Sequence, residues 1–431
     1  MSSRKRYAQV GMGSRSGMYT RAIANDYREH GQMVALCDTN PGRLQRARAS
    51  HEALAEVATY LAGDFERMVA EQKPDVVVVT TVDSTHDEYI IRAMELGCDV
   101  ITEKPMTIDA ERCRAILDTV DRTGRSLRVT FNYRYAPPRS QVRRMIAEGQ
   151  IGRILSVDFA WMLDTRHGAD YFRRWHGERA NSGSLLVHKA THHFDLVNWW
   201  LGDRPAEVFC QGSREYYTPA HADELGLGDR GKRCLTCPAA GRCPFYLDLN
   251  DSPDMKALYL DNEQHDGYFR DRCVFGERID IWDTMSASVR YRGGALLNYM
   301  LHAYSPHEGY RIAFNGTKGR IEHVACENTY MSGDGTVPGE LTKGNVQTTR
   351  IREFSAPEAI EVATGEGGHG GGDPKLLDDL FLPEPGEDPL GLRAGETDGA
   401  YSILVGVAGC RSIDEGRPVG IDELLGPHAG R

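Results

Sequence analysis

The sequence predicts an α/β protein with two parts: a doubly wound parallel sheet at the N-terminus, and a C-terminal α/β domain built on a large, mostly antiparallel open sheet. Two observations predict this. Apolar runs alternate with helical segments over residues 7–132, the pattern of a parallel sheet. After Pro137-Pro138 the pattern changes to longer strand-like stretches. We therefore expect one domain at 1–135 and a second at 136–431.

The first element is a βαβ unit at residues 7–38. A strand over 7–10 runs into Gly11-x-Gly13-x-x-x-Gly17, a helix follows, and a second strand ends on Asp38. In such a unit the first glycine permits a tight turn and the second lets the backbone approach a pyrophosphate. A carboxylate at the position of Asp38 accepts both ribose hydroxyls, which favours NAD over NADP. The unit predicts an NAD-binding Rossmann domain, although the glycine spacing is one residue longer than usual.

Three more strands follow, at 74–81, 99–105 and 127–132, separated by helices at 86–96 and 108–123. Ligands of such sheets bind at the carboxyl ends of the strands, so the loops at these ends should share one crevice. The candidate cofactor ligands in these loops and at the end of the second strand are Gly11, Gly13, Ser14, Arg15, Asp38, Thr81, His86, Glu103 and Lys104.

The second domain contains six strand-like stretches and closing helices within 375–431. The strands are expected at 155–162, 208–212, 285–291, 295–303, 311–314 and 319–323, with a hairpin turn at 292–294. A glycine-rich run, 365–374, is either a flexible linker or a loop that brings His369 and its backbone close to a ligand.

The stretch from Gly183 to Gly202 predicts one helix. His188, His192 and Asp195 fall at i, i+4 and i+7 on one face, with Lys189 and His193 beside them. A lone histidine here would suggest only a half-buried structural residue. Five titratable groups within eight residues cost much desolvation if they are buried and unused. We therefore expect this helix to face the substrate.

A cationic cluster precedes that helix in residues 164–176. Guanidinium groups match carboxylate or sulfonate oxygens, so the cluster favours an anionic substituent on the substrate; a solvated loop is the alternative. Its candidate substrate residues are Arg166, His167, Arg173, Arg174, Trp175 and His176.

Cysteines mark an insertion at about 218–278. Cys234-x2-Cys237-x5-Cys243, with Cys273 further on, has the composition of a tetrahedral structural zinc site. Free thiols in an insertion are the alternative.

Several of these motifs together resemble the Gfo/Idh/MocA family of sugar oxidoreductases. The resemblance rests on Gly11-x-Gly13, Glu103-Lys104-Pro105, Asn132-Tyr-Arg-Tyr135 and His192-His-Phe-Asp195, supported by 309–312 and 315–322. It implies NAD(P) binding, Lys104 near the nicotinamide and the reacting hydroxyl, and His192 on the opposite wall. It also implies an open C-terminal sheet that often forms the oligomer interface. The family commonly has an aspartate four residues before the histidine, where this chain has His188.

The resemblance and the residues together predict an NAD-dependent enzyme that takes a hydride from a ring hydroxyl, C3, of an anionic sugar or glycoside. Lys104 and His192 are the expected acid/base groups, with Lys189 and His188 as a second pair. Tyr133 and Arg134 would orient substrate hydroxyls, unless Arg134 is a structural ion-pair partner. Two alternatives stay open: a redox-neutral NAD-dependent glycosidase, such as a sulfoquinovosidase, and a non-catalytic sugar or cofactor sensor. The remaining candidate substrate residues are His193, Asp195 and His369.

Composition narrows the partners and the compartment. The 431-residue chain has a formal net charge of −11, which argues against binding to nucleic acid or anionic membranes. No apolar run reaches the ~20 residues that cross a bilayer, and ten cysteines in a chain of this length are expected to be mostly reduced thiols. The predicted location is cytoplasmic, and the predicted assembly is a homodimer or homotetramer through the C-terminal sheet.

Overall fold

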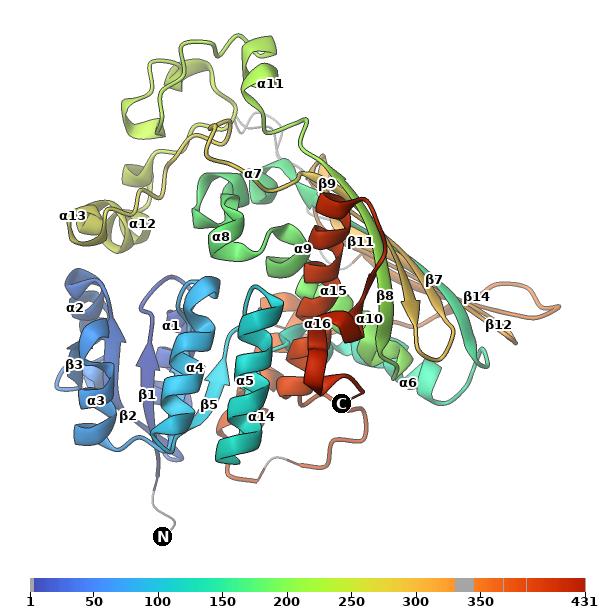
Figure 1. Cartoon of the computed structure of the whole chain (residues 1–431), viewed down its shortest axis with the longest axis horizontal. Coiled ribbons are helices and arrows are strands. Elements are labelled where there is room, and N and C mark those ends of the chain that lie inside the picture. The colour runs from blue at the N-terminus through green and yellow to red at the C-terminus, as the bar shows by residue number, and fades with distance from the viewer. Residues whose placement is uncertain (1–3, 330–344, 367, 385, 431) are drawn as a thin grey trace. The chain divides into compact units, whose positions relative to one another are not determined.

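The computed structural model describes residues 4–329, 345–366, 368–384 and 386–430 (Figure 1). The chain divides into two compact units. The first unit comprises Met1–Asn132, Asp248–Arg270 and Asp373–Ala400; the second comprises Tyr133–Leu247, Asp271–Gly372 and Tyr401–Arg431. Part of the Cys-containing insertion therefore belongs to the N-terminal unit.

The first unit is built on a six-stranded parallel sheet. Its strands are β1 (Lys5–Val10), β2 (Gly31–Asp38), β3 (Ala58–Leu61), β4 (Val76–Val79), β5 (Asp99–Thr102) and β6 (Leu127–Val129). Their order is β3-β2-β1-β4-β5-β6, with every neighbouring pair parallel. The strand order reverses direction between β1 and β4, which is the switch point where ligands bind in open α/β sheets. The predicted doubly wound parallel sheet is confirmed.

The helices of the first unit are α1 (Ser16–Arg21), α2 (Pro41–Ala49), α3 (Phe65–Gln72), α4 (His86–Glu95), α5 (Ala110–Thr123), α12 (Pro253–Leu258), α13 (Glu263–Asp266) and the part of α14 (Gly368–Phe381) that begins at Asp373. The single helix predicted after the glycine turn widens into a π-helix at Ala22–Asp26. Leu377 and Phe381 of α14 pack into the same core as Tyr7 of β1, with the Tyr7 and Phe381 ring centroids 5.3 Å apart.

The second unit is built on a nine-stranded sheet. The strands are β7 (Ile154–Asp164), β8 (Pro205–Ser213), β9 (Thr284–Tyr291), β10 (Leu296–Ser305), β11 (His307–Gly316), β12 (Gly319–Thr329), β13 (Asn345–Arg352), β14 (Glu358–Ile360) and β15 (Val419–Gly420). Their order is β14-β13-β12-β11-β7-β10-β9-β8-β15. Among the described strands of this sheet, only the central β10–β7 pair is parallel. The predicted mostly antiparallel sheet is confirmed, and its six predicted strands are present.

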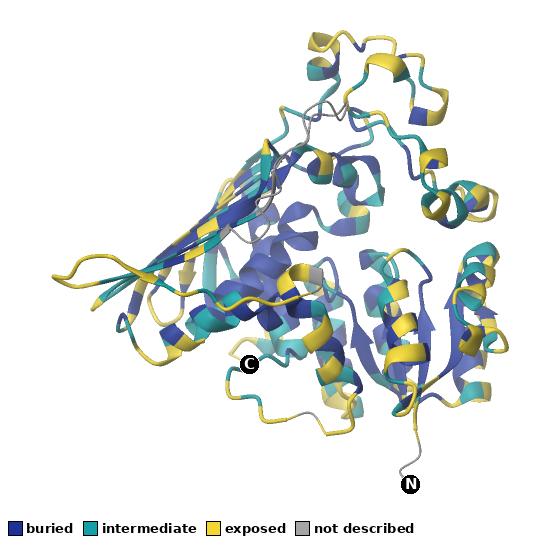
Figure 2. Ribbon diagram, turned by 180° about the vertical axis from the view of Figure 1, so that it is seen from behind, coloured by how far each residue is buried: buried dark blue, intermediate teal, exposed yellow. Residues whose placement is uncertain are grey.

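One face of this sheet packs against helices. The helices of the second unit are α6 (Pro137–Ala147), α7 (Thr165–Arg173), α8 (Arg179–Ser182), α9 (Leu185–His188), α10 (Ala190–Leu201), α11 (Pro219–Glu224), α15 (Glu396–Glu415, in this unit from Tyr401) and α16 (Ile421–Leu425). Phe194 of α10 packs on Tyr299 of β10, while Leu296 and Met300, on the other face of that strand, stay exposed. Figure 2 shows buried and exposed positions along the strands of this sheet. None of the helices described is long and apolar enough to cross a membrane.

The stretch predicted as one helix, Gly183–Gly202, is two. Helix α9 ends at His188, Lys189 joins the two, and α10 begins at Ala190. At the junction the N–H of His192 bonds to the carbonyl of Lys189, three residues back instead of four, which breaks the regular helix. The prediction of one continuous helix is therefore wrong: His188 belongs to α9, whereas His192 and Asp195 belong to α10.

The glycine-rich run is packed, in its described part, instead of being a free linker. A Cβ at Gly365 would lie 2.8 Å from Pro137 Cγ, and one at Gly371 would lie 2.7 Å from Gly365 Cα. His369, Gly370 and Gly371 have positive φ values of 53°, 68° and 86°. The glycines allow the chain to turn tightly here before α14 continues.

Candidate functional site

The glycine turn after β1 fits a dinucleotide. Gly11 has φ +89°, and a Cβ there would lie 2.6 Å from the carbonyl oxygen of Thr80, so the turn requires glycine. A Cβ at Gly13 would meet no protein atom within 4 Å. The packing of the protein therefore does not require a glycine at position 13, whereas close approach of a pyrophosphate does.

Asp38, at the end of β2, is buried beside this turn. Its carboxylate accepts hydrogen bonds from the backbone N–H groups of Met12 and of Asn40, the latter at 2.7 Å. Burial raises the pKa of Asp38, and the two backbone donors oppose that rise. Each carboxylate oxygen keeps acceptor capacity, so the group fits the predicted ribose contact.

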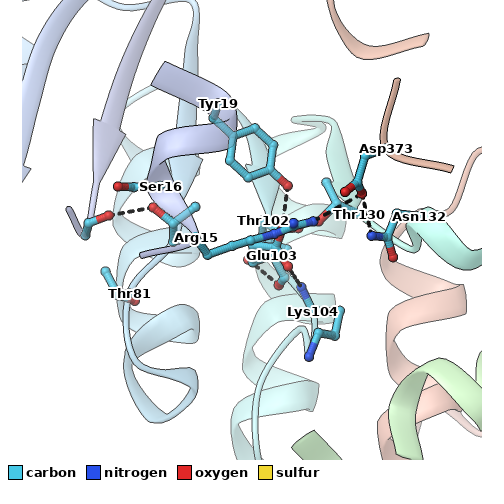
Figure 3. A network of polar contacts seen from close by, with 12 residues as sticks. Arg15, Ser16, Tyr19, Thr81, Thr102, Glu103, Lys104, Thr130, Asn132 and Asp373 are labelled. Carbon is cyan, nitrogen blue, oxygen red and sulfur yellow. Dashed lines mark hydrogen bonds and ion pairs between the residues drawn. The ribbon is translucent and has the colours of Figure 1, made fainter. Parts of the chain in front are cut away.

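Glu103 is the centre of a buried network after β5 (Figure 3). Its Oε1 accepts hydrogen bonds from Arg15 Nε at 2.6 Å and from the Tyr19 hydroxyl at 2.7 Å, and its Oε2 accepts one from the Lys104 backbone N–H at 3.3 Å. Burial alone would raise the pKa of Glu103, but the charges of Arg15 and Lys104 and the hydrogen bonds outweigh it and lower the pKa. Glu103 is therefore a carboxylate that fixes the turn carrying Lys104.

The side chain of Lys104 extends away from that network, as Figure 3 shows. The peptide bond between Lys104 and Pro105 is cis. His86 braces the same region, because its Nδ1 lies 2.8 Å from the Pro105 carbonyl oxygen and its Nε2 lies 3.2 Å from that of Thr81. His86 thus connects two of the predicted cofactor loops, and burial lowers its pKa.

Asp373 reaches the network from the second half of the sequence. Its Oδ1 accepts a hydrogen bond from Asn132 Nδ2 at 2.6 Å and lies 3.7 Å from Arg15 Nη2 (Figure 3). Tyr19 and Asp373 were not among the predicted site residues. The only sequence signal was an aspartate at the end of the glycine run.

In the second unit Tyr133 is the centre of an aromatic stack. The His192 ring lies parallel to the Tyr133 ring at a centroid distance of 4.2 Å, and Trp161 stacks on Tyr133 at 5.8 Å. The guanidinium carbon of Arg139 lies 4.1 Å from the centroid of the Tyr133 ring. His369 is 5.6 Å from the same centroid. The structure thus brings three predicted residues together: Tyr133, His192 and His369.

Lys189 lies beside this stack and is 4% exposed. Its Nζ is 3.3 Å from the Tyr133 hydroxyl and 4.0 Å from Glu308 Oε1. Glu308 Oε2 also lies 2.8 Å from His167 Nδ1. Burial alone would raise the pKa of Glu308, but the contacts with His167 and the charge of Lys189 outweigh burial and lower that pKa. The hydroxyl of Tyr171 is 2.9 Å from His167 Nε2. Glu308 was missed because it lies in a strand pattern without a motif.

Two of the arginines predicted to bind substrate instead form ion pairs or hydrogen bonds with other residues of the protein. Arg134 makes a two-point ion pair with Asp195, with Nε 2.8 Å from Oδ2, and both side chains are buried. Arg173 donates to the Phe245 carbonyl at 2.6 Å and to Cys234 Sγ at 3.1 Å, so it holds the base of the insertion. Arg134 therefore matches the open alternative of a structural ion-pair partner.

The other predicted cations are distributed around α7 and α9. Arg174 pairs with Asp170 at 3.5 Å. The rings of His176 and His188 are 4.2 Å apart, and Trp175 stacks on His176 at 3.5 Å. His193 lies elsewhere, stacked on Trp161 at 4.0 Å with its Nδ1 2.7 Å from the Tyr299 hydroxyl. Arg166 is exposed, and no ion pair is found for it among the described residues.

The predicted zinc site finds no support. Among the residues that the structure describes, no group of three or more His, Cys, Asp or Glu is placed to hold a metal ion. Cys234, Cys237, Cys243 and Cys273 are free. Burial raises the pKa of Cys243 and of Cys273, and the neighbouring thiols Cys234 and Cys237 add to that rise. The sulfur of Cys237 accepts a hydrogen bond from the Gly231 N–H.

Comparison with known proteins decides the family. A model of an oxidoreductase family with an NAD-binding Rossmann fold matches residues 5–131, and the model of that family's C-terminal alpha/beta domain matches residues 143–421. The chain belongs to the Gfo/Idh/MocA oxidoreductase family. The resemblance inferred from the sequence motifs is confirmed.

Relatives of this Gfo/Idh/MocA protein include enzymes of sugar and inositol chemistry. It is 39% identical over 432 residues to the Bacillus subtilis (strain 168) protein YteT, a match that covers 96% of this chain and 97% of that protein. It is 30% identical over 190 residues to an inositol 2-dehydrogenase/D-chiro-inositol 3-dehydrogenase of Lactiplantibacillus plantarum, covering 44% of this chain and 49% of that enzyme. A D-glucoside 3-dehydrogenase of Escherichia coli matches at 30% over 171 residues, covering 40% of this chain and 47% of that enzyme.

Solved Gfo/Idh/MocA-like structures share the fold over almost the whole chain. The WlbA dehydrogenase of Bordetella pertussis, in complex with NADH and UDP-GlcNAcA, has a TM-score of 0.64 at 20% identity, covering 97% of this chain and 98% of that one. Aldose-aldose oxidoreductase of Caulobacter crescentus, complexed with glycerol, has a TM-score of 0.62 at 18% identity and covers 97% and 99%.

Proposed function

We propose that this protein oxidises a ring hydroxyl of a carbohydrate with NAD, at C3 of a sugar or glycoside that carries an anionic group. The observation that carries the proposal is Lys104, held at the carboxyl end of β5 by the bond from its backbone N–H to the buried Glu103 carboxylate, with its side chain extending away from that network. Relatives that act on inositols and glucosides support the substrate class.

NAD supplies the hydride acceptor when it is bound. The turn at Gly11 and Gly13 and the carboxylate of Asp38 would hold it. Lys104 takes the proton of the reacting hydroxyl as the general base. His192 relays or supplies the same proton from the substrate side, and its ring is fixed by stacking on Tyr133.

The second unit orients the sugar. We assign this role to Tyr133, Lys189 and Glu308: the Lys189 ammonium donates to the Tyr133 hydroxyl and forms an ion pair with the Glu308 carboxylate. We assign Arg166 as the cation that binds an anionic substituent. The other candidate arginines interact within the protein: Arg134 pairs with Asp195, Arg173 donates to the Phe245 carbonyl, and Arg174 pairs with Asp170.

A redox-neutral glycosidase is the second candidate. It needs a further acid/base pair to remove the proton at C2 of the transient 3-keto sugar. Lys189 is a buried lysine beside a carboxylate and a phenol, which is an environment for such a group.

One experiment separates these functions. The purified protein is incubated with NAD and nitrophenyl glycosides of neutral, uronic and sulfonated sugars. Accumulating NADH identifies the dehydrogenase, whereas aglycone release without net NADH identifies the glycosidase. Neither signal, with NAD binding intact, would leave the sensor alternative.

The cofactor prediction follows from Asp38. We expect NAD to bind at least tenfold more tightly than NADP, a difference of ~1.4 kcal/mol or more, because the carboxylate repels a 2′-phosphate. Titration of the protein with each nucleotide, followed by fluorescence, measures both dissociation constants. Equal affinities would contradict the assignment of Asp38.

The exposed face of the nine-stranded sheet supports a homo-oligomer. Phe209, Leu296 and Met300 are large apolar residues of this face with 38%, 55% and 39% exposure. We expect Met300→Glu with Leu296→Glu to lower the mass measured by analytical ultracentrifugation, because buried charges oppose packing of two such faces. Leu235→Glu, at a 43% exposed residue outside this sheet, is the control. An unchanged mass of the sheet variant would contradict the sheet interface.

A further inference from the structure

A short part of the insertion lies in the first unit, although it is more than 200 positions from the glycine motif. Helices α12 and α13 dock on α2, the helix that follows Asp38. The approach is close, because a Cβ at Gly42 would lie 1.7 Å from Asn262 Oδ1. Asn40, which is fully buried, donates from Nδ2 to the Asn262 carbonyl and to Asp266 Oδ2, each at 3.0 Å.

A cavity of about 270 Å³ lies between this segment, the glycine turn and α2. Its lining includes Gly13 and Gly17 of the turn, Arg43 and Arg46 of α2, and Asp254, Met255 and Leu258 of α12. The cavity begins at the turn assigned to the pyrophosphate. The insertion therefore supplies an apolar wall next to the place where the adenosine half of a dinucleotide belongs.

Arg43 is the group at this site that would bind a 2′-phosphate. Rossmann proteins that accept NADP have an arginine near the end of the second strand, and Arg43 lies five residues after Asp38. Here its Nη1 is 2.7 Å from Asp266 Oδ2, with side-chain exposures of 12% and 16%. Its Nε donates to the Leu258 carbonyl at 3.4 Å, and its guanidinium carbon lies 5.9 Å from the ring centroids of both Tyr259 and Tyr268.

We infer that Asp266 is a specificity-determining residue for the cofactor: by pairing with Arg43 it prevents that arginine from binding a 2′-phosphate. The inference rests on the proposed NAD site and adds a second carboxylate to Asp38. The charge of Asp266 also raises the pKa of Asp38, after the larger effect of burial, so the two carboxylates are electrostatically coupled. Arg43 pairs with Asp266 and also acts electrostatically on Asp38, so these two carboxylates share the charge of one guanidinium.

The test measures nucleotide binding without any sugar. In Asp266→Asn the amide keeps the size of the side chain and removes its charge, so Arg43 is released. We expect the ratio of the NADP and NAD dissociation constants, measured by isothermal titration calorimetry on the full chain, to fall about tenfold. Adding Arg43→Ala to Asp266→Asn should restore the wild-type ratio, because the arginine that gains the phosphate is then absent.

Asp261→Asn is the matched control, since Asp261 lies on the same segment but pairs with Lys256. A ratio that stays within twofold of the wild type in Asp266→Asn, or an equal fall in Asp261→Asn, would overturn the inference. Should Asp266→Asn fail to fold, Asp266→Ser takes its place, because it also removes the charge and keeps an acceptor for the hydrogen bond from Asn40. The same tenfold fall in the ratio is expected, and a ratio within twofold of the wild type overturns the inference. A protein that binds NAD as expected but oxidises no carbohydrate contradicts only the proposed function.

Discussion

Replacing Lys104 by alanine should reduce kcat by ~10²–10⁴-fold, the usual loss for a missing acid/base group. NAD binding should change little, because the turn at Gly11 and Gly13 and the Asp38 carboxylate do not depend on the lysine side chain. Steady-state kinetics on the substrate found in the glycoside screen, with nucleotide titration in parallel, measures both effects. Turnover near the wild-type value would contradict the proposed mechanism.

The second half of this expectation concerns His192. His192→Ala should reduce kcat by a similar factor, and the double variant should be far less than additively impaired if both groups act on one proton. His221→Ala is a control, because that histidine lies in α11, where its Nδ1 is 3.1 Å from Glu224 Oε2. A fully additive double variant would contradict a shared proton path.

Asp195→Ala should lower the free energy of unfolding by ~3–5 kcal/mol, because it leaves the charge of Arg134 buried without its partner. Both side chains are almost fully buried, at 3% and 1% exposure, and the pair is two-pointed. Urea denaturation followed by fluorescence measures the change.

Asp414→Asn provides the comparison. The Arg179–Asp414 pair has a similar N–O distance of 2.6 Å, but its side chains are 32% and 48% exposed. We expect a loss below ~1 kcal/mol, because water screens the exposed pair. Equal losses in the two variants would contradict the structural role of the buried pair.

The fold was predictable where periodicity is strong. The run of four valines at Val76–Val79 predicts an interior strand, and the structure has a strand there that is buried at every position. Strand β3 was not predicted, because only Tyr60 of its four residues is buried and an edge strand has no apolar run. The helix predicted at 183–202 is interrupted at Lys189. The spacing of apolar and polar residues does not reveal that the Lys189 carbonyl accepts a hydrogen bond from a residue three positions on instead of four.

The candidate site was predictable in its motifs but not in its partners. Glu103, Lys104, Tyr133 and His192 belong to sequence motifs. Glu308 lies in a strand, and its pairing with His167 and Lys189 depends on tertiary contacts between segments more than a hundred residues apart. For the same reason Arg173 was predicted to bind substrate, although its guanidinium donates a hydrogen bond to the Phe245 carbonyl of the insertion.

The route of the chain has a consequence for dissecting this protein. Between Asn132 and Tyr401 the backbone passes from one unit to the other five times. A fragment that stops at Asn132 lacks Leu377 and Phe381, so the surface around Tyr7 that they cover would be exposed to water. Neither unit corresponds to one continuous stretch of sequence. A single proteolytic cut between the units therefore leaves them covalently joined elsewhere, and nucleotide binding has to be studied on the whole chain.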